Sequence, residues 1–177
     1  MLYINSVRNQ NQLFQIIKKD AYQFCHSTKI KSIIKLSIFH PGFRAVWLIR
    51  LTQLQFPFSR ILIKMLKIHL LKSYGCDIGL GCKIGSGLRI EHPVGIVIGS
   101  GVRIGNNFTC SQNVTIGEKY IDSRAKGLYP IIGNDVNVGA GAAIIGDITV
   151  GDNVTIGAHS LILKNVNKNK TIVGILT

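Results

Sequence analysis

The most regular feature of the chain is an aliphatic residue that recurs at every sixth position from Ile78 onward. A weaker apolar series runs two positions before it, and glycine often follows it. A period of six matches neither the 3.6-residue repeat of a helix nor the two-residue alternation of an ordinary strand. It is typical of a hexapeptide solenoid, so we predict a parallel β-helix whose principal aliphatic residues point inward. The series runs Ile78, Ile84, Ile90, Ile96, restarts two residues late as Ile98, Ile104, Cys110, Ile116, and continues after a gap as Ile132, Val138, Ile144, Val150, Ile156, Ile162.

The first break in the period falls within GLRIEHPVGIVIG, residues 87–99. A strand must keep its inward register, so two extra residues should bulge outward at a corner and display His92. Asp77 lies 15 residues before His92, just short of one coil of three hexads, so we expect it one strand below the imidazole. A carboxylate beside an imidazole fixes its tautomer and supports its protonated form. The pair is therefore a candidate general base, and a chance neighbourhood on the surface is the alternative.

The second break is the stretch EKYIDSRAKGLYP, residues 118–130. It is polar and too long for a corner turn, so we predict a protruding loop. In a symmetric trimer such a loop reaches the His92 corner of a neighbouring subunit.

The segment before the solenoid is basic and helical in pattern. We predict helices over about 9–25, 41–55 and 58–72. Residues 1–73 contain twelve Lys and Arg residues but a single acid, Asp20, so they carry most of the net charge of +13. Such helices either lie on an anionic membrane surface or pack against the solenoid and neighbouring subunits. The predicted organisation is a basic helical region over 1–73, a β-helix over 74–167 with the loop 118–130, and a C-terminal tail over 168–177.

Several functions are disfavoured by composition. The four cysteines form no C-x-x-C pair and have no histidine at ligand spacing, so we expect neither a metal nor a disulfide framework. The chain has no aromatic stacking motif of a nucleic-acid-binding fold, so nucleic acid is not an expected partner. The polar start MLYINSVRNQNQLFQ lacks a cleavable apolar segment, and we expect a cytoplasmic protein, with the inner face of the membrane as one place for it.

A set of motifs occurs in a characteristic order: FHPGFRAVWLIRL (39–51), EHPVGIVIG (91–99), NVTIG (113–117), IGNDVNVGAGAAIIGDITVGDNVTIGAHSLILKNV (132–166) and TIVG (171–174). Together they resemble the serine O-acetyltransferase family of hexapeptide-repeat acyltransferases, over about residues 39–174. The resemblance implies a left-handed parallel β-helix with an N-terminal α-helical region, acetyl-CoA as donor and a homotrimer. It also implies His92 as the catalytic base and Asp77 as its partner.

The resemblance extends to the acetyl-CoA site. Ala140 and Ala158 match positions that offer backbone groups to the pantetheine arm, although small corner residues are common in any solenoid. The backbone N–H of Gly117 is a candidate for the oxyanion of the tetrahedral intermediate. Lys164 is a candidate for the CoA phosphates, with a solvated face as the alternative.

Three departures from the family concern the acceptor. Glu91 stands where the family has Asp before its catalytic histidine, Leu128-Tyr129 stand in place of an Arg-His pair, and Ser27-Thr28 in place of an Asp-Pro. A zwitterion needs charged partners, so we expect Glu91 and Tyr129 to lie beside a different acceptor. The profile is similar to capsule and colanic acid O-acetyltransferases, which predicts acetyl transfer to a saccharide hydroxyl of a surface polysaccharide or its precursor. Serine O-acetyltransferase activity and a non-catalytic scaffold are the alternatives.

Overall fold

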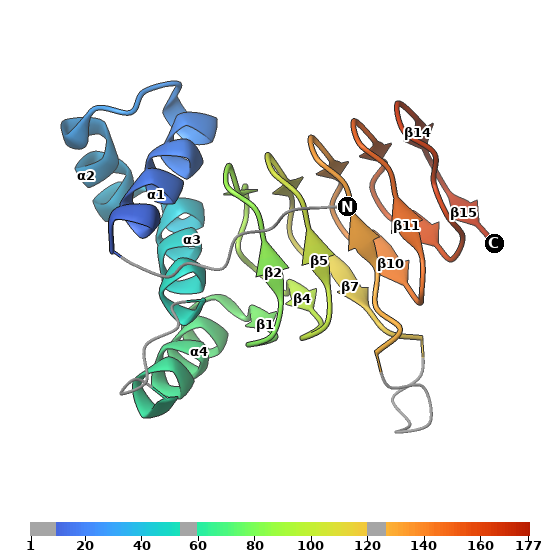
Figure 1. Ribbon diagram of the computed structural model, residues 1–177, viewed down its shortest axis with the longest axis horizontal. Coiled ribbons are helices and arrows are strands. Elements are labelled where there is room, and N and C mark those ends of the chain that lie inside the picture. Colours follow the sequence, from blue (N-terminus) through green and yellow to red (C-terminus); the bar gives the residue numbers. More distant parts are fainter. Residues whose placement is uncertain (1–9, 54–59, 120–126) are drawn as a thin grey trace.

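Four helices lie at one end of a stack of coiled strands in the computed structural model, which describes residues 10–53, 60–119 and 127–177 (Figure 1). Helix α3 contacts each of the other three helices and also packs on the first coil at β3. The helical region therefore caps the open end of the solenoid. The helices are α1 (Gln10–Cys25), α2 (Ile30–Phe39), α3 (Pro41–Thr52) and α4 (Arg60–Tyr74).

Helix α2 is absent from the sequence prediction, whereas the other three helices overlap the predicted segments. Residues 9, 54–55 and 58–59 of those segments lie outside the described residues, and α3 ends at Thr52, earlier than predicted. Pro41 separates α2 from α3, because a proline cannot continue a preceding helix. His40 then caps α3, where its Nδ1 accepts a hydrogen bond from Phe43 N at 3.3 Å.

The solenoid consists of three parallel sheets, and successive strands visit them in turn. We call them sheets A, B and C. Sheet A contains β1 (Asp77–Ile78), β4 (Val97–Ile98), β7 (Thr115–Gly117), β10 (Ala143–Ile145), β13 (Leu161–Ile162) and β15 (Ile175–Leu176). Sheet B contains β2 (Lys83–Ile84), β5 (Arg103–Ile104), β8 (Ile131–Ile132) and β11 (Thr149–Val150). Sheet C contains β3 (Arg89–Ile90), β6 (Thr109–Cys110), β9 (Asn137–Val138), β12 (Thr155–Ile156) and β14 (Thr171–Ile172).

The hexad pattern is confirmed at the level of single residues. The principal series is buried, from Ile78 at 3 % exposed to Ile162 at 0 %, and Cys110 occupies its inward position. Strand register also shows the first break: Asp77 pairs with Val97, 20 residues later, whereas Val97 pairs with Thr115, 18 residues later. The two extra residues are therefore accommodated in the turn between β3 and β4, as predicted.

The corner between sheets B and C is held by a ladder of amide and carboxylate side chains. Asn106 Oδ1 accepts from Ser86 N at 3.0 Å, Asn134 Oδ1 accepts from Asn106 N at 2.9 Å, and Asp152 Oδ1 accepts from Asn134 N at 2.6 Å. The next position turns with a positive φ, 57° at Asn107, which asparagine tolerates better than most residues. Side chains at one corner thus accept hydrogen bonds from backbone N–H groups at the corner of the neighbouring coil.

The helical region is tied to the first coil by a buried ion pair. Asp20 of α1 and Arg50 of α3 both have fully buried side chains, with Nε and Oδ2 2.8 Å apart. Asp20 Oδ1 also accepts from the backbone N–H groups of Gly87 and Leu88 at 2.7 and 2.8 Å. Arg50 donates to the carbonyl of Gly85 at 2.6 Å. We call this cluster the latch, because it joins two helices to one turn of the solenoid.

The C-terminal segment differs from the predicted tail. Within 168–177 the strands β14 and β15 extend sheets C and A, because Thr171 and Ile175 continue the parallel registers of β12 and β13. Among the described helices, none has the length and apolar content needed to span a bilayer.

Candidate functional site

His92 lies on the corner that leads from sheet C into sheet A. We call this corner, formed by residues 91–96, 111–114, 139–142 and 157–160 of successive coils, the histidine edge. The His92 side chain is exposed, and the turn is closed by a hydrogen bond from Val94 N to His92 O at 2.8 Å. Gly95 has a φ of 67°, and a side chain there would collide with Asn113 of the next coil. The bulge therefore depends on glycine, and it presents the imidazole to solvent.

Asp77 lies beneath the same edge but contacts a different group. Its N–H donates to Ile96 O at 2.8 Å, which places its backbone under the end of the His92 turn. Its carboxylate pairs with Lys67 of α4 at 3.0 Å, and no hydrogen bond joins it to His92 among the described residues. The side chain of Asp77 is 49 % exposed, so this surface pair is weak and leaves the carboxylate free to rotate. Lys67 could not be predicted as a partner of Asp77, since nothing in the repeat shows which face of α4 meets the first coil.

Glu91 pairs with an arginine that was not among the predicted site residues. Arg89 Nε lies 2.5 Å from Glu91 Oε1, in an ion pair whose two side chains are about one-third exposed. Arg89 also donates to Gln23 O of α1 at 2.8 Å, and its guanidinium lies over the ring of Phe24. Strand alternation was an available signal, because Glu91 follows β3 directly and lies two positions after Arg89, on the same side of the chain. The segment just before His92 thus contains one positive and one negative side chain, which pair with each other.

The amino end of α3 covers this part of the first coil. Gly42 is buried, and a Cβ at this position would collide with Ile90 O and lie 3.3 Å from Glu91 O. The helix can approach the backbone next to His92 only because residue 42 has no side chain.

Tyr129 packs against the preceding coil of the solenoid. Its ring lies over the turn Gly99-Ser100-Gly101 of the preceding coil, where a Cβ on Gly99 would be 2.9 Å from the ring and one on Gly101 would collide with it. Tyr129 is partly buried against the solenoid core. The ring thus packs on the flat surface that the two glycines leave, and the role of Tyr129 toward an acceptor stays a prediction. Residues 120–126 of the predicted loop lie outside the described residues.

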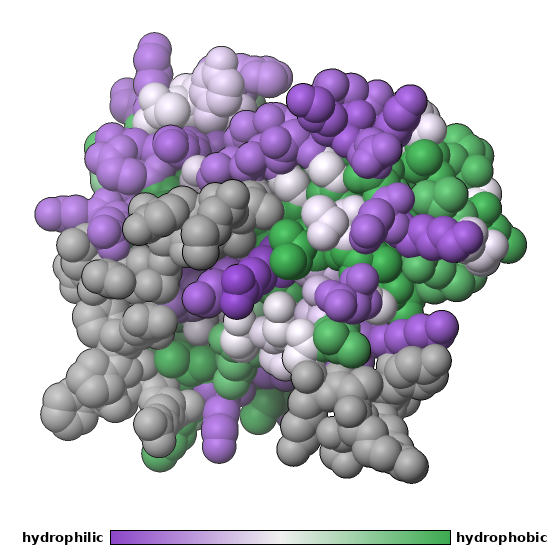
Figure 2. Space-filling view, turned by 45° about the vertical axis from the view of Figure 1, so that its right-hand side comes forward, coloured by the Kyte–Doolittle hydropathy of each residue, from purple (hydrophilic) through white to green (hydrophobic). Residues whose placement is uncertain are grey.

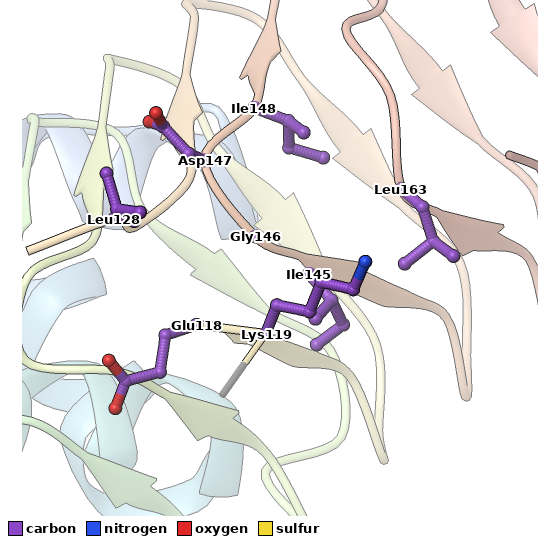
Figure 3. A pocket seen from close by; sticks show the side chains of 8 residues that line it. All are labelled: Glu118, Lys119, Leu128, Ile145, Gly146, Asp147, Ile148 and Leu163. Atoms are coloured by element: carbon purple, nitrogen blue, oxygen red, sulfur yellow. The ribbon is translucent and has the colours of Figure 1, made fainter. Parts of the chain in front are cut away.

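A hollow of about 220 Å³ opens beside the base of that loop (Figure 3). It lies on the corner that leads from sheet A to sheet B, which we call the loop edge: residues 79–82, 99–102, 118–119, 127–130, 146–148 and 163–165. Its walls combine aliphatic groups with two carboxylates and a lysine. They are Glu118, Lys119, Leu128, Ile145, Gly146, Asp147, Ile148 and Leu163.

The predicted acetyl-CoA residues divide between these two edges. Ala140 and Ala158 lie on the histidine edge, one and two strands beyond β7 in sheet A. Gly117 ends β7 on the loop edge, its carbonyl accepts from Gly146 N at 2.9 Å, and a Cβ there would meet nothing within 4 Å. Lys164 is exposed on the loop edge beside the hollow. Within one chain, His92 and Gly117 therefore lie at opposite ends of the strands of sheet A.

Three of the four cysteines, Cys76, Cys82 and Cys110, are buried. Burial raises the pKa of the Cys82 and Cys110 thiols to about 12, which keeps them protonated. In the described part of the chain, histidine, cysteine and carboxylate side chains form no cluster of three that suits a metal ion.

In a comparison with known protein families, residues 129–164 match the family model described as bacterial transferase hexapeptide (six repeats). The serine acetyltransferase of Synechococcus elongatus is 44 % identical over 64 residues, which are 36 % of this chain and 25 % of that protein. The serine acetyltransferase of Staphylococcus xylosus is 41 % identical over 69 residues, 39 % of this chain and 31 % of that protein. The matched segments thus span about a quarter to a third of these relatives.

Solved serine acetyltransferases share the fold over nearly the whole chain. A truncated apoenzyme has a TM-score of 0.82 at 28 % identity and covers 94 % of this chain and 69 % of that chain. The enzyme of Neisseria gonorrhoeae has a TM-score of 0.79 at 28 % identity, with 93 % and 64 % covered. The predicted fold class, a left-handed parallel β-helix with an N-terminal helical region, is therefore confirmed. Residues 129–164 match the hexapeptide-repeat model of bacterial transferases, and the chain is similar in sequence and fold to serine acetyltransferases.

The expected polysaccharide acceptor is wrong on these comparisons, since the matched relatives are serine acetyltransferases. The prediction rested on charges missing at Leu128-Tyr129 and Ser27-Thr28. It included Glu91 as a residue beside the acceptor but not Arg89, which pairs with Glu91 in the segment just before His92. Loss of charge from the loop therefore does not leave the site uncharged.

Proposed function

We propose that this protein transfers an acetyl group from acetyl-CoA to the hydroxyl of L-serine. The observation that carries the proposal is the exposed His92 on a glycine-dependent bulge, in a chain that shares the fold and local sequence of serine acetyltransferases. Glu91 supplies a carboxylate for the ammonium group of serine, and Arg89 a guanidinium on the same face for its carboxylate.

The reaction needs one general base and no enzyme nucleophile. His92 removes the proton of the serine hydroxyl while its oxygen attacks the thioester carbonyl. The tetrahedral intermediate collapses by breaking the C–S bond, and the imidazolium returns the proton to the departing CoA sulfur. Asp77 supports the imidazolium after its carboxylate turns away from Lys67.

The donor site is completed by a second copy of the chain. His92, Ala140 and Ala158 line one edge of sheet A, whereas Gly117, Lys164 and the hollow lie on the other. A symmetric trimer brings the loop edge of one chain to the histidine edge of the next, so that the pantetheine arm lies between them. The open space in front of Gly117 then faces the thioester.

The first test is CoA-thiol release from acetyl-CoA with L-serine, ethanolamine or 3-hydroxypropionate as acceptor. Ethanolamine lacks the carboxylate and 3-hydroxypropionate lacks the amine, so both should react far more slowly than L-serine. Absence of serine-dependent release, with the fold intact, rejects the proposal. Equal rates with all three acceptors reject the roles of Arg89 and Glu91.

The base is tested with a matched pair of histidine variants. His92→Ala should lower kcat by about 10²–10⁴-fold, as loss of a general base typically does. His159→Asn is the control, because His159 is exposed on the same edge and asparagine accepts its φ of 55°. Full activity of His92→Ala contradicts the assignment.

The shared site is tested by complementation. Gly117→Leu should fold, because nothing lies within 4 Å of a Cβ there, but it should block the donor site. Co-refolding this variant with His92→Ala should restore activity, since mixed trimers contain interfaces with both halves intact. Mixtures as inactive as the separate variants contradict a site between chains.

A further inference from the structure

Helix α2 carries an exposed stripe of isoleucines. Ile30, Ile34 and Ile38 are 62 %, 53 % and 57 % exposed, and their spacing of four residues places them on one face. Phe39, at the end of the helix, is 75 % exposed. Isolated exposed aliphatic residues are ordinary, but an aligned set of large side chains on one helix face marks a contact surface.

The face of α2 next to this stripe is already occupied. Ile33 is 5 % exposed and packs with α1 and α3, and Trp47 Nε1 of α3 donates to Ser37 Oγ at 3.0 Å. These contacts fix the rotation of α2 about its axis, so the isoleucine stripe has to face outward. In Figure 1, α2 lies at the end of the molecule farthest from the C-terminal strands.

Lysines flank the stripe. Lys29, Lys31 and Lys35 are exposed, and within the described residues no carboxylate lies within ion-pair distance of them. Helix α2 itself contains no acidic residue. The only acid among residues 1–73, Asp20, is buried in the latch. The surface around the stripe is therefore positive, with no acid of its own to neutralise it.

We infer that α2 docks on the surface of an anionic lipid bilayer, with its isoleucines among the acyl chains and its lysines at the headgroups. An apolar stripe bordered by cations is the pattern that suits this interface. A twofold contact between α2 helices of two copies suits it less well, because lysines would face lysines with no acid between them. The inference is independent of the proposed enzymatic function, since α2 contributes no residue to the candidate site.

The test is co-sedimentation of the full chain with phosphatidylcholine vesicles and with vesicles containing phosphatidylglycerol. Binding is expected only with the anionic lipid, and it should weaken as salt is added. The double variant Lys31→Ala/Lys35→Ala should bind about 30-fold more weakly, since each lysine near the surface contributes about a factor of five. Ile34→Ser/Ile38→Ser should bind at least about tenfold more weakly.

Val173→Ser is the matched control. Val173 is 77 % exposed, and it lies in the turn between β14 and β15 at the other end of the molecule, where Figure 2 shows an apolar surface over the C-terminal coils. This variant should bind vesicles like the unaltered chain. Circular dichroism of each variant verifies that the fold is retained.

Three outcomes overturn the inference. One is undiminished binding by the isoleucine variant, and another is loss of binding in Val173→Ser, which assigns the contact to the other end. The third is a failure of the unaltered chain to bind vesicles together with dissociation of an oligomer by Ile34→Ser/Ile38→Ser in sedimentation velocity. In that case α2 contacts a second copy of the chain.

Discussion

Removal of the charge of Asp20 is the sharpest test of how the helical region is held. The carboxylate accepts from Arg50 Nε at 2.8 Å, Arg50 Nη2 at 2.9 Å, and the N–H groups of Gly87 and Leu88. Asp20→Asn keeps the shape but leaves the guanidinium of Arg50 buried without a counter-charge. The asparagine amide also has only one oxygen, so in either orientation its NH₂ group faces at least one of the N–H donors that the carboxylate accepted from.

The expected loss is about 3–5 kcal/mol, which is typical when one partner of a buried ion pair is removed. That is a large share of a typical domain stability of about 5–15 kcal/mol. Arg50→Met leaves a buried carboxylate and removes the donor to Gly85 O and Ile84 O, so we expect a similar loss. The double variant should cost at least about 2 kcal/mol less than the two single changes together, because it leaves no orphan charge.

The assay is urea unfolding, monitored by circular dichroism, of the unaltered chain, the two single variants and the double variant. Lys67→Met provides the control, since the Lys67–Asp77 pair is partly exposed and should contribute less than about 1 kcal/mol. Additive single losses, or a loss below about 1 kcal/mol for Asp20→Asn, refute the view that the latch acts as one buried unit.

Other predictions follow from individual contacts. Gly42→Ala should destabilise the protein by about 1–3 kcal/mol, as judged by thermal unfolding, because the clash with Ile90 O outweighs the gain in helix propensity; a rise in Tm contradicts this. Burial raises the pKa of Cys110 and Cys82 from 9.0 to about 12, so the folded state favours the protonated thiols. Their contribution to folding stability is therefore fully present below about pH 9 and is lost as pH rises toward 12. Iodoacetamide at about pH 8 should therefore label Cys25 first and the others only after unfolding; mass spectrometry that finds Cys110 labelled in the native protein contradicts the burial argument.

Much of the solenoid follows from local sequence because each hexad repeats the same requirement. An inward residue such as Ile104 or Cys110 stacks on its equivalent in the next coil, so periodicity alone reveals which side chains form the core. The bulge at His92 was predictable for the same reason, since two surplus residues can leave the register only at a corner. Helix α2 was not predicted because its apolar residues are mostly exposed. Only Ile33 is buried, so the sequence shows no apolar face directed at a core.

The partners of the site residues depended on tertiary structure. The repeat gave no information on α4, so Lys67 could not be placed beside Asp77, and Tyr129 could not be seen to lie on Gly99 and Gly101. Arg89 was within reach of a strand-alternation argument, but its contact with α1 was not.

The sequence by itself determined the β-helix, its inward series and the exposed corner at His92, because these arise from interactions between equivalent positions of neighbouring coils. Only the tertiary structure decided how the helical region meets the first coil, through the latch and the contact of Gly42 with Ile90. It also decided that His92 and Gly117 lie on opposite edges of sheet A. The physical reason is that a repeat encodes contacts at a fixed spacing, whereas contacts between a helix and a coil, or between two edges, have no period to reveal them.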